Sequence, residues 1–181
     1  MRAGQDLRVL TASDNREFVL RALDWSDADD LLELENSLVD EDADVSVEAK
    51  KTRVQIVKWV AEQLVGVEND EKIAIVAEVD GRTVGYVLVE SQGGRSSHVG
   101  CLTVMVGDTY RGVGIGTGLL EEAEKQSRRL GLKILEFEVY ATNERAKRVY
   151  DKRGYTQVGY LPNAFSKHGS YVDSIIMAKV L

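Results

Sequence analysis

Four glycines stand at alternate positions, directly before a segment with the apolar spacing of a helix: Gly112, Gly114, Gly116 and Gly118. Because a glycine inside a helix costs roughly 1 kcal/mol relative to alanine, a cluster of them at a helix start needs a reason. The first amides of a helix have no partner within the helix and carry partial positive charge, and a missing Cβ lets an anion approach the backbone closely. With Arg111 immediately before the cluster, the stretch predicts a phosphate-binding turn.

The spacing of the glycines narrows the phosphate ligand. The loop of nucleotide triphosphatases requires a Gly-Lys pair followed by Ser or Thr, whereas the first lysine after the cluster is Lys125. The dinucleotide fingerprint requires glycines at positions 1, 3 and 6, and position 6 is Thr117 or Leu119, depending on the starting glycine. A nicotinamide-dependent oxidoreductase remains an alternative, because Glu136 lies at about the separation expected of its ribose-binding acid.

A second group of polar residues falls on one face of the helix predicted over residues 143–153. Asn143, Lys147 and Tyr150 lie at i, i+4 and i+7, so the amide and the phenol share a face, and Asn143 can also cap the helix. A phenol has a pKa near 10 and can protonate a departing thiolate where the transition state favours that transfer. Taken alone, Tyr150 would be interpreted as a core aromatic.

Apolar spacing predicts an α/β domain around these two motifs. Strands joined by two or three residues are antiparallel neighbours, whereas a strand, a helix and a further strand form the right-handed crossover that makes two strands parallel. We therefore predict a mixed, mostly antiparallel sheet with a central parallel strand pair flanked by helices, in one domain over residues 18–181 after an N-terminal extension of unknown role at 1–17. The expected strands cover residues 18–23, 72–79, 83–90, 98–106, 133–142, 155–161 and 171–180; the expected helices begin at Ser26 or Asp27, at 47 (ending at 65, before Gly66), at 117 (ending at 130) and at 143 (ending at 153).

Composition excludes several kinds of site. Cys101 is the only cysteine, so no disulfide within the chain is expected, and its apolar neighbours predict a buried thiol. Two histidines are too few for a histidine-based metal site, so no metal is expected. No stretch approaches the roughly 18 apolar residues of a membrane span, and the first thirty residues lack a leader pattern, so we expect a soluble cytoplasmic protein.

Negative charge is concentrated in one segment. The formal net charge is −7, and residues 24–48 contain eleven Asp and Glu residues but no Lys or Arg. Such a local field disfavours nucleic acid and anionic membranes as partners and attracts cations. The alternative interpretation is a solvated acidic helix face followed by an acidic loop.

The motifs together resemble a known family. Residues 111–116 (RGVGIG) match the Arg/Gln-x-x-Gly-x-Gly/Ala signature of the GNAT superfamily of acetyl-coenzyme A dependent N-acetyltransferases, between a strand and a helix. Residues 143–155 (NERAKRVYDKRGY) resemble the family's fourth helix and the turn after it. Residues 169–177 (GSYVDSIIM) resemble the branch that acts on polyamines, amino acids and protein N-termini. The resemblance covers the chain from about residue 72 to its end.

The resemblance implies acetyl-coenzyme A as cosubstrate and gives roles to the matched positions. The end of the strand at 98–106 would run beside the pantetheine arm, and an amide between Val104 and Val106 would polarise the acetyl carbonyl like an oxyanion hole. Asn143 would contact the pantetheine, and Tyr150 would lie near the sulfur and protonate the departing thiolate. The expected cofactor-binding residues are Val104, Met105, Val106, Arg111, Gly112, Val113, Gly114, Ile115, Gly116, Thr117, Asn143 and Tyr150.

The resemblance also implies that a neutral primary amine attacks the acetyl group directly in a ternary complex. Candidate bases are Glu35, Glu138 and His98, with water relays as an option; strand alternation places Glu138 on one face with Glu136 and Tyr140. Tyr150, Glu138 and Glu35 are the expected catalytic residues. A non-catalytic acyl-coenzyme A binding module is the alternative function.

The first two helices and their connection wall the acceptor side in the family. Here that region is the acidic run, so residues 40–44, or Glu33 and Glu35, are expected to attract a cationic acceptor. A predicted loop at 162–170, with Asn163, Phe165 and His168, is a second expected specificity element. The last strand could complete a sheet within one chain or between two, which leaves a homodimer open.

Overall fold

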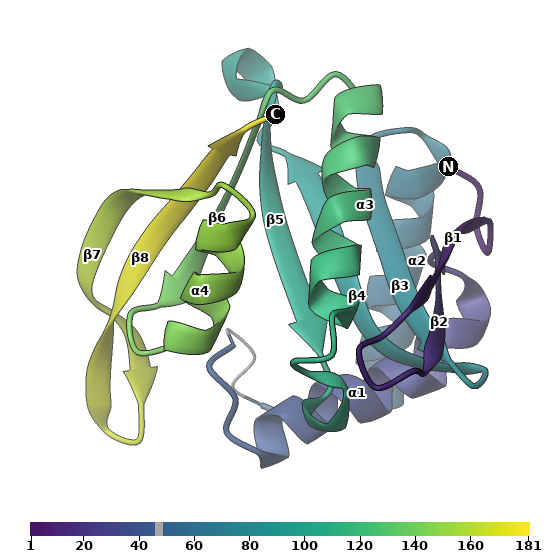
Figure 1. The fold of residues 1–181 in the computed structure, drawn as a ribbon, viewed down its shortest axis with the longest axis horizontal. Helices are drawn as coiled ribbons and strands as arrows, with labels where there is room; N and C mark the ends of the chain where they lie inside the picture. The colour runs from purple at the N-terminus through teal and green to yellow at the C-terminus, as the bar shows by residue number, and fades with distance from the viewer. Residues whose placement is uncertain (46–48) are drawn as a thin grey trace.

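The computed structural model of the chain describes residues 1–45 and 49–181. One mixed sheet runs through the described residues, with the strand order β1-β2-β3-β4-β5-β6-β8-β7 (Figure 1). The strands are β1 (Asp6–Thr11), β2 (Glu17–Ala22), β3 (Lys72–Val79), β4 (Arg82–Ser91), β5 (Val99–Val106), β6 (Ile134–Tyr140), β7 (Thr156–Lys167) and β8 (Ser170–Val180). Neighbouring strands are antiparallel except β5 and β6, so the predicted mixed sheet with one central parallel pair is confirmed.

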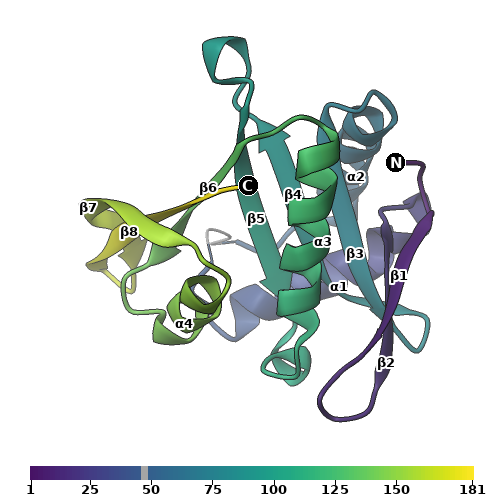
Figure 2. The same ribbon diagram turned by 45° about the horizontal axis from the view of Figure 1, so that its top comes forward.

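Helices cover both faces of the sheet. Helix α1 (Ala28–Asp40) and α2 (Arg53–Glu68) lie on one face, and α3 (Ile115–Arg129) and α4 (Glu144–Lys152) lie on the other (Figures 1 and 2). The alternation of β3 shows why two cores form: Ile75 packs in the cluster of α3, whereas Ala74 and Val76 pack in the cluster of α1 and α2. Within the described part of the chain, none of these helices is long and apolar enough to cross a membrane.

The parallel pair is joined only at its beginning. Residues Val99, Gly100 and Cys101 of β5 pair with Ile134, Leu135 and Glu136 of β6, and no later residues of the two strands pair. Beyond Cys101 the strands diverge (Figures 1 and 2), so one edge of β5 and one edge of β6 face an opening instead of each other.

The N-terminal residues extend the sheet, and they explain one glycine of the cluster. Strand β1 pairs with β2 at the sheet edge. Helix α3 begins at Ile115, two residues earlier than predicted, and Gly118 lies within it, as in the prediction. A Cβ on Gly118 would lie 3.0 Å from Leu10 Cδ1 and 3.2 Å from the Phe18 ring. Gly118 therefore serves close packing of α3 on β1 and β2, rather than a phosphate.

The second helix differs from its prediction at both ends. Its predicted start at residue 47 lies outside the described residues, but the helix begins only at Arg53, because Thr52 and Gln55 form a capping box there. Gly66 does not end the helix, which runs on to Glu68. A Cβ on Gly66 would lie 2.6 Å from the Lys72 side chain, so this glycine provides room for β3.

The predicted loop at 162–170 is wrong. Strand β7 continues through Pro162 to Lys167 and turns at His168 and Gly169 directly into β8. Proline lacks a backbone donor, but β7 is the outermost strand, and its register is irregular between Leu161 and Phe165. The two strands form a long hairpin beside β6, and the hairpin brings Phe165 and Lys167 to the opening between β5 and β6.

Candidate active site

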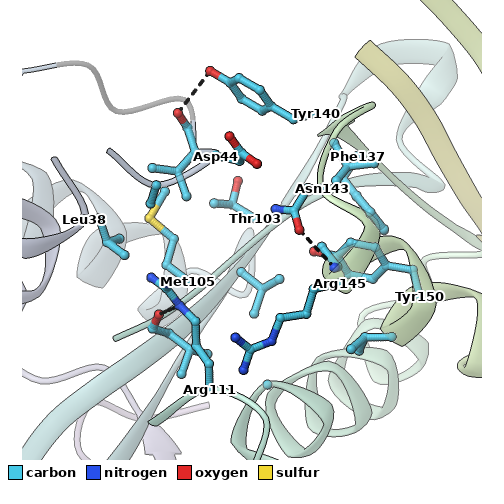
Figure 3. A pocket seen from close by; sticks show the side chains of 18 of the residues that line it. Leu38, Asp44, Thr103, Met105, Arg111, Phe137, Tyr140, Asn143, Arg145 and Tyr150 are labelled. Carbon is cyan, nitrogen blue, oxygen red and sulfur yellow. Dashed lines mark hydrogen bonds between the residues drawn. The ribbon is translucent and has the colours of Figure 1, made fainter. Parts of the chain in front are cut away.

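A cleft of about 870 Å³ lies where β5 and β6 diverge (Figure 3). Most of the predicted cofactor residues line it: Val104, Met105, Val106, Arg111, Gly112, Gly114, Gly116, Thr117, Asn143 and Tyr150. Two do not. Ile115 is fully buried in the core, and Val113 accepts a hydrogen bond from the Ser13 amide (2.9 Å) through its carbonyl.

The glycine turn is shaped to hold an anion. Gly112 and Gly114 have φ values of +80° and +104°, a conformation that favours glycine. A Cβ on Gly112 would lie 2.8 Å from the Arg145 guanidinium, and the position of a Cβ on Gly114 has no heavy atom within 4 Å. The turn thus leaves a cradle at the N-terminus of α3, with a cation beside it, and this donor set fits the pyrophosphate of a coenzyme A.

Arg145 is the functional candidate that the sequence analysis missed. It follows Asn143 by two positions, so helical spacing does not place it on the face of Asn143 and Tyr150. In the structure it lines the cleft and reaches from α4 to the glycine turn of α3 (Figure 3). Only the packing of α4 beside that turn makes the arginine a phosphate candidate.

Arg111 is held in place by two partners. Its Nε donates to the Val106 carbonyl (2.8 Å), and its terminal nitrogens form an ion pair with Glu41, with 3.1 Å between Nη1 and Oε2. The bond to Val106 ties the glycine turn to the end of β5. The bond to Glu41 ties it to the segment that follows α1.

Tyr150 presents its hydroxyl to the cleft from a buried position. Its side chain is 8% exposed and packs against Phe137, with ring centroids 4.3 Å apart. Burial alone raises the pKa of Tyr150 to about 12, so the phenol is protonated at neutral pH. Among the described residues, its hydroxyl has no hydrogen-bond partner, so the proton is available to a group in the cleft.

Asn143 has a structural task in addition to its place in the cleft. Its Oδ1 accepts from the Ala146 amide (3.0 Å) and caps α4 as predicted. Asn143 and Tyr150 both line the cleft, as expected from their shared helix face. The cap fixes the start of the helix that carries both Arg145 and Tyr150.

Glu138 lies on the α1 side of β6. Strand alternation turns Phe137 and Val139 to the core of α3, which leaves Glu138 and Tyr140 on the opposite face. Ser174, which is fully buried, donates to Glu138 Oε2 (2.8 Å). This bond orients a cleft-lining carboxylate that can accept a proton from an amine, directly or through water.

Glu35 and His98 lie away from the cleft lining. Glu35, on α1, is 1% exposed; it accepts from the Tyr86 hydroxyl of β4 (2.9 Å) and pairs with Lys51, just before α2. Burial, and then the Glu35 charge, raise the pKa of Tyr86 well above its usual value. His98 is exposed, and the described lining of the cleft includes neither Glu35 nor His98.

The prediction of a buried Cys101 is wrong. The residue is exposed and lines the cleft, because Cys101 is the last residue of β5 that pairs with β6 before the two strands diverge. Partial burial, and then the charge of Glu136, raise the pKa of the thiol, so it is less reactive than an ordinary cysteine.

The acidic run is neutralised largely by basic residues from elsewhere in the chain. Its described ion pairs with Lys and Arg are Arg21–Asp27, Arg53–Asp29, Arg82–Asp30, Arg82–Glu33, Lys51–Glu35, Lys50–Asp40, Arg111–Glu41, Lys167–Asp42 and Lys167–Asp44. In addition, His168 Nε2 lies 2.6 Å from Asp42 Oδ2. Asp42 and Asp44 are the members of the run that line the cleft. The run therefore acts mainly as a set of clamps, and only its end near residue 44 bears on a ligand.

The sequence of the chain is similar to those of a known protein family. The sequence model of the Acetyltransferase (GNAT) family matches residues 26–155. L-amino acid N-acetyltransferase AaaT of Escherichia coli K12 is 31% identical over 108 residues, which are 59% of this chain and 67% of that protein. The uncharacterized N-acetyltransferase MJ1530 of Methanocaldococcus jannaschii is 35% identical over 105 residues, which are 58% of this chain and 64% of that protein.

Solved structures share the fold over nearly the whole chain. Ribosomal-protein-alanine N-acetyltransferase from Brucella melitensis has a TM-score of 0.81 at 25% identity and covers 90% of this chain and 99% of its own. YncA, a putative acetyltransferase from Salmonella typhimurium, was solved with its cofactor acetyl-CoA; its TM-score is 0.79 at 22% identity, over 91% of this chain and 94% of its own.

Proposed function

This chain belongs to the GNAT acetyltransferase family, and we propose that it moves an acetyl group from acetyl-coenzyme A to a primary amine. The acceptor classes considered are polyamines, amino acids and protein N-termini, and the amine attacks directly within a ternary complex. One observation carries the proposal: a phosphate-shaped glycine turn and a protonated, unpartnered tyrosine hydroxyl line the same cleft.

The donor end of the cleft consists of the glycine turn (residues 111–117), Asn143, Arg145 and Tyr150. Backbone amides of the turn and the Arg145 guanidinium would bind the pyrophosphate, and Asn143 would contact the pantetheine. The free edge of β5 offers backbone groups to an extended arm, and an amide between Val104 and Val106 would polarise the acetyl carbonyl. Acetyl-coenzyme A supplies the activated thioester.

Side chains of the protein would accept the proton that the ammonium loses and donate a proton to the departing thiolate. The amine must be neutral to attack, which costs about 4 kcal/mol at pH 7.4 for a lysine-like amine and under 1 kcal/mol for a protein α-amino group. Glu138, directly or through water, would take the proton that the ammonium loses. As the new C–N bond forms and the C–S bond breaks, Tyr150 would give its proton to the departing thiolate, and the proton that the attacking nitrogen loses as the amide forms would return to the phenolate through water.

The test is release of free thiol from acetyl-coenzyme A in the presence of spermidine, spermine, single amino acids and peptides with varied N-termini. Turnover that falls sharply in Tyr150→Phe is the expected result. A chain that acetyl-coenzyme A stabilises by about 2.7 kcal/mol at 100 times its Kd, but that acetylates no amine, would instead be a binding module. Stabilisation by NAD and not by acetyl-coenzyme A would refute both functions.

A further inference from the structure

Charge divides the cleft into two unlike ends. The acceptor end is the part on the α1 side, where the ionised lining residues are Asp42, Asp44, Glu138 and Lys167. Three carboxylates thus face one ammonium among the described residues there. A substrate ammonium is attracted to such an end, and a substrate carboxylate is repelled from it.

The single cation of the described acceptor end is already engaged within the chain. Lys167 Nζ lies 2.6 Å from Asp44 Oδ1, 2.9 Å from the Asp42 carbonyl and 3.2 Å from Asp42 Oδ2. The first two contacts are hydrogen bonds and the third is an ion-pair contact, so two of the three N–H donors of this ammonium are used within the chain. Lys167 therefore closes the hairpin onto the segment after α1, and two carboxylates already oppose its charge before a substrate carboxylate approaches.

The other cations of the described cleft lining belong to the donor end. Arg111 is engaged by the Val106 carbonyl and by Glu41. Arg145 stands beside Gly112, where a phosphate is expected. Neither arginine therefore adds a free cation to the acceptor end.

The wall of the acceptor end is apolar and aromatic. The Tyr140 ring stacks on Phe165 with centroids 3.9 Å apart and planes 6° apart. The Tyr140 hydroxyl donates to the Val45 carbonyl (3.3 Å), which joins this stack to the segment after α1. Val45 and Leu38 also line the cleft, so apolar side chains form part of the wall of the acceptor end.

From this arrangement we infer that the acceptor is a primary amine with an apolar group beside it and no neighbouring carboxylate, as at the N-terminus of a peptide, and that free amino acids are poor substrates. The inference rests on the proposed acetyl transfer and specifies its acceptor. It also differs from what the name of the Escherichia coli relative would suggest by analogy.

A pair of matched small molecules isolates the carboxylate. 3-Methylbutylamine is leucine without its carboxylate, and its amine is more basic, so the neutral fraction alone would favour leucine. We expect kcat/KM for 3-methylbutylamine to exceed that for leucine by about tenfold or more, equivalent to about 1.4 kcal/mol. A leucine value equal or higher would overturn the inference.

Two further acceptors test the apolar wall. A tripeptide beginning with leucine should have a higher kcat/KM than triglycine, whose first residue has no side chain to contact the apolar wall. The reverse order would refute the apolar group beside the amine. Calorimetric titration of leucine and of 3-methylbutylamine into the protein with coenzyme A reports the same preference without turnover, so tighter binding of leucine would refute the inference even if no acetyl transfer occurred.

A charge variant tests whether Asp44 contributes to the preference for an amine without a carboxylate. Asp44→Asn removes one negative charge from the acceptor end and keeps an oxygen that can accept from Lys167, so leucine should gain several-fold in kcat/KM relative to 3-methylbutylamine. Asp40→Asn is the matched control, because Asp40 lies in the same acidic run, pairs with Lys50 and is outside the described cleft lining. An unchanged ratio in Asp44→Asn, or an equal change in both variants, would contradict the charge argument.

Discussion

Removal of the Tyr150 hydroxyl should separate catalysis from stability. The ring packs against Phe137, with centroids 4.3 Å apart, and a phenylalanine retains that contact. Because the hydroxyl has no hydrogen-bond partner among the described residues, its loss leaves no other buried group unpaired. We expect the free energy of unfolding of Tyr150→Phe to stay within about 0.5 kcal/mol of the wild type.

The rate of acetyl transfer should respond much more strongly. A positioned proton donor contributes about 10²–10⁴-fold, which corresponds to about 2.7 to 5.4 kcal/mol of transition-state stabilisation. Since the phenol acts on the departing thiolate, kcat should fall by this factor, whereas the Kd for acetyl-coenzyme A should change by about twofold or less. Thiol release at saturating cosubstrate measures kcat, and calorimetry measures Kd.

The pH dependence gives a second check with a definite sign. The pKa of Tyr150 is raised to about 12, and the donor must be protonated to act, so activity that depends on this proton persists until the pH approaches that value. The wild type should therefore show no loss of kcat from this group between pH 7 and 10. An alkaline fall centred below pH 10 that disappears in Tyr150→Phe would show that the pKa of Tyr150 is not raised.

Tyr155 provides the control for Tyr150. Its ring packs on the same Phe137, with centroids 5.1 Å apart, but it does not belong to the described cleft lining. Tyr155→Phe should keep kcat within about threefold of the wild type. Equal losses of kcat in the two variants, or a loss of more than about 2 kcal/mol of stability in Tyr150→Phe, would mean that the hydroxyl acts through packing.

Three other substitutions test the phosphate turn and the clamps. Gly112→Ala should weaken acetyl-coenzyme A binding about tenfold in calorimetry, because the new Cβ meets the Arg145 side chain. Gly81→Ala is the control: Gly81 has a φ of +76° and no heavy atom within 4 Å of a Cβ, so the substitution has a similar backbone cost and should leave the Kd unchanged. Arg145→Ala should weaken the same binding about tenfold and make it less sensitive to salt, and unchanged salt dependence would argue against a phosphate contact. Asp27→Ala breaks a buried pair with Arg21 (2.6 Å) and should cost about 3 to 5 kcal/mol in denaturant unfolding, whereas Asp29→Ala, in an exposed pair, should cost under about 1 kcal/mol; similar losses would contradict the burial argument.

Sequence patterns correctly predicted the features that depend on interactions between residues near one another in the chain. The helix at Asn143, its cap, the hairpin between β3 and β4, and the crossover that makes β5 and β6 parallel all follow from spacing within a few turns or strands. The glycine turn was also readable, because an amide cradle at a helix start needs positions without Cβ. Gly118 packs against Leu10 and Phe18, which are distant in sequence, whereas Gly66 lies against Lys72 and the predicted loop pairs with β8; all three depend on contacts between elements, which spacing within one element does not report.

The order of the elements and the chemistry of the donor turn can thus be read from the amino acids alone, since helix caps, turns and strand alternation act between near neighbours. Tertiary structure decided which carboxylates a ligand can meet: it buried Glu35 between two helices, left Glu138 in the cleft, and paired Lys167 with Asp42 and Asp44 across more than 120 residues. The sequence does not show which charged residues pair, because ion pairs form between the side chains that the packed sheet and helices bring within about 4 Å of each other.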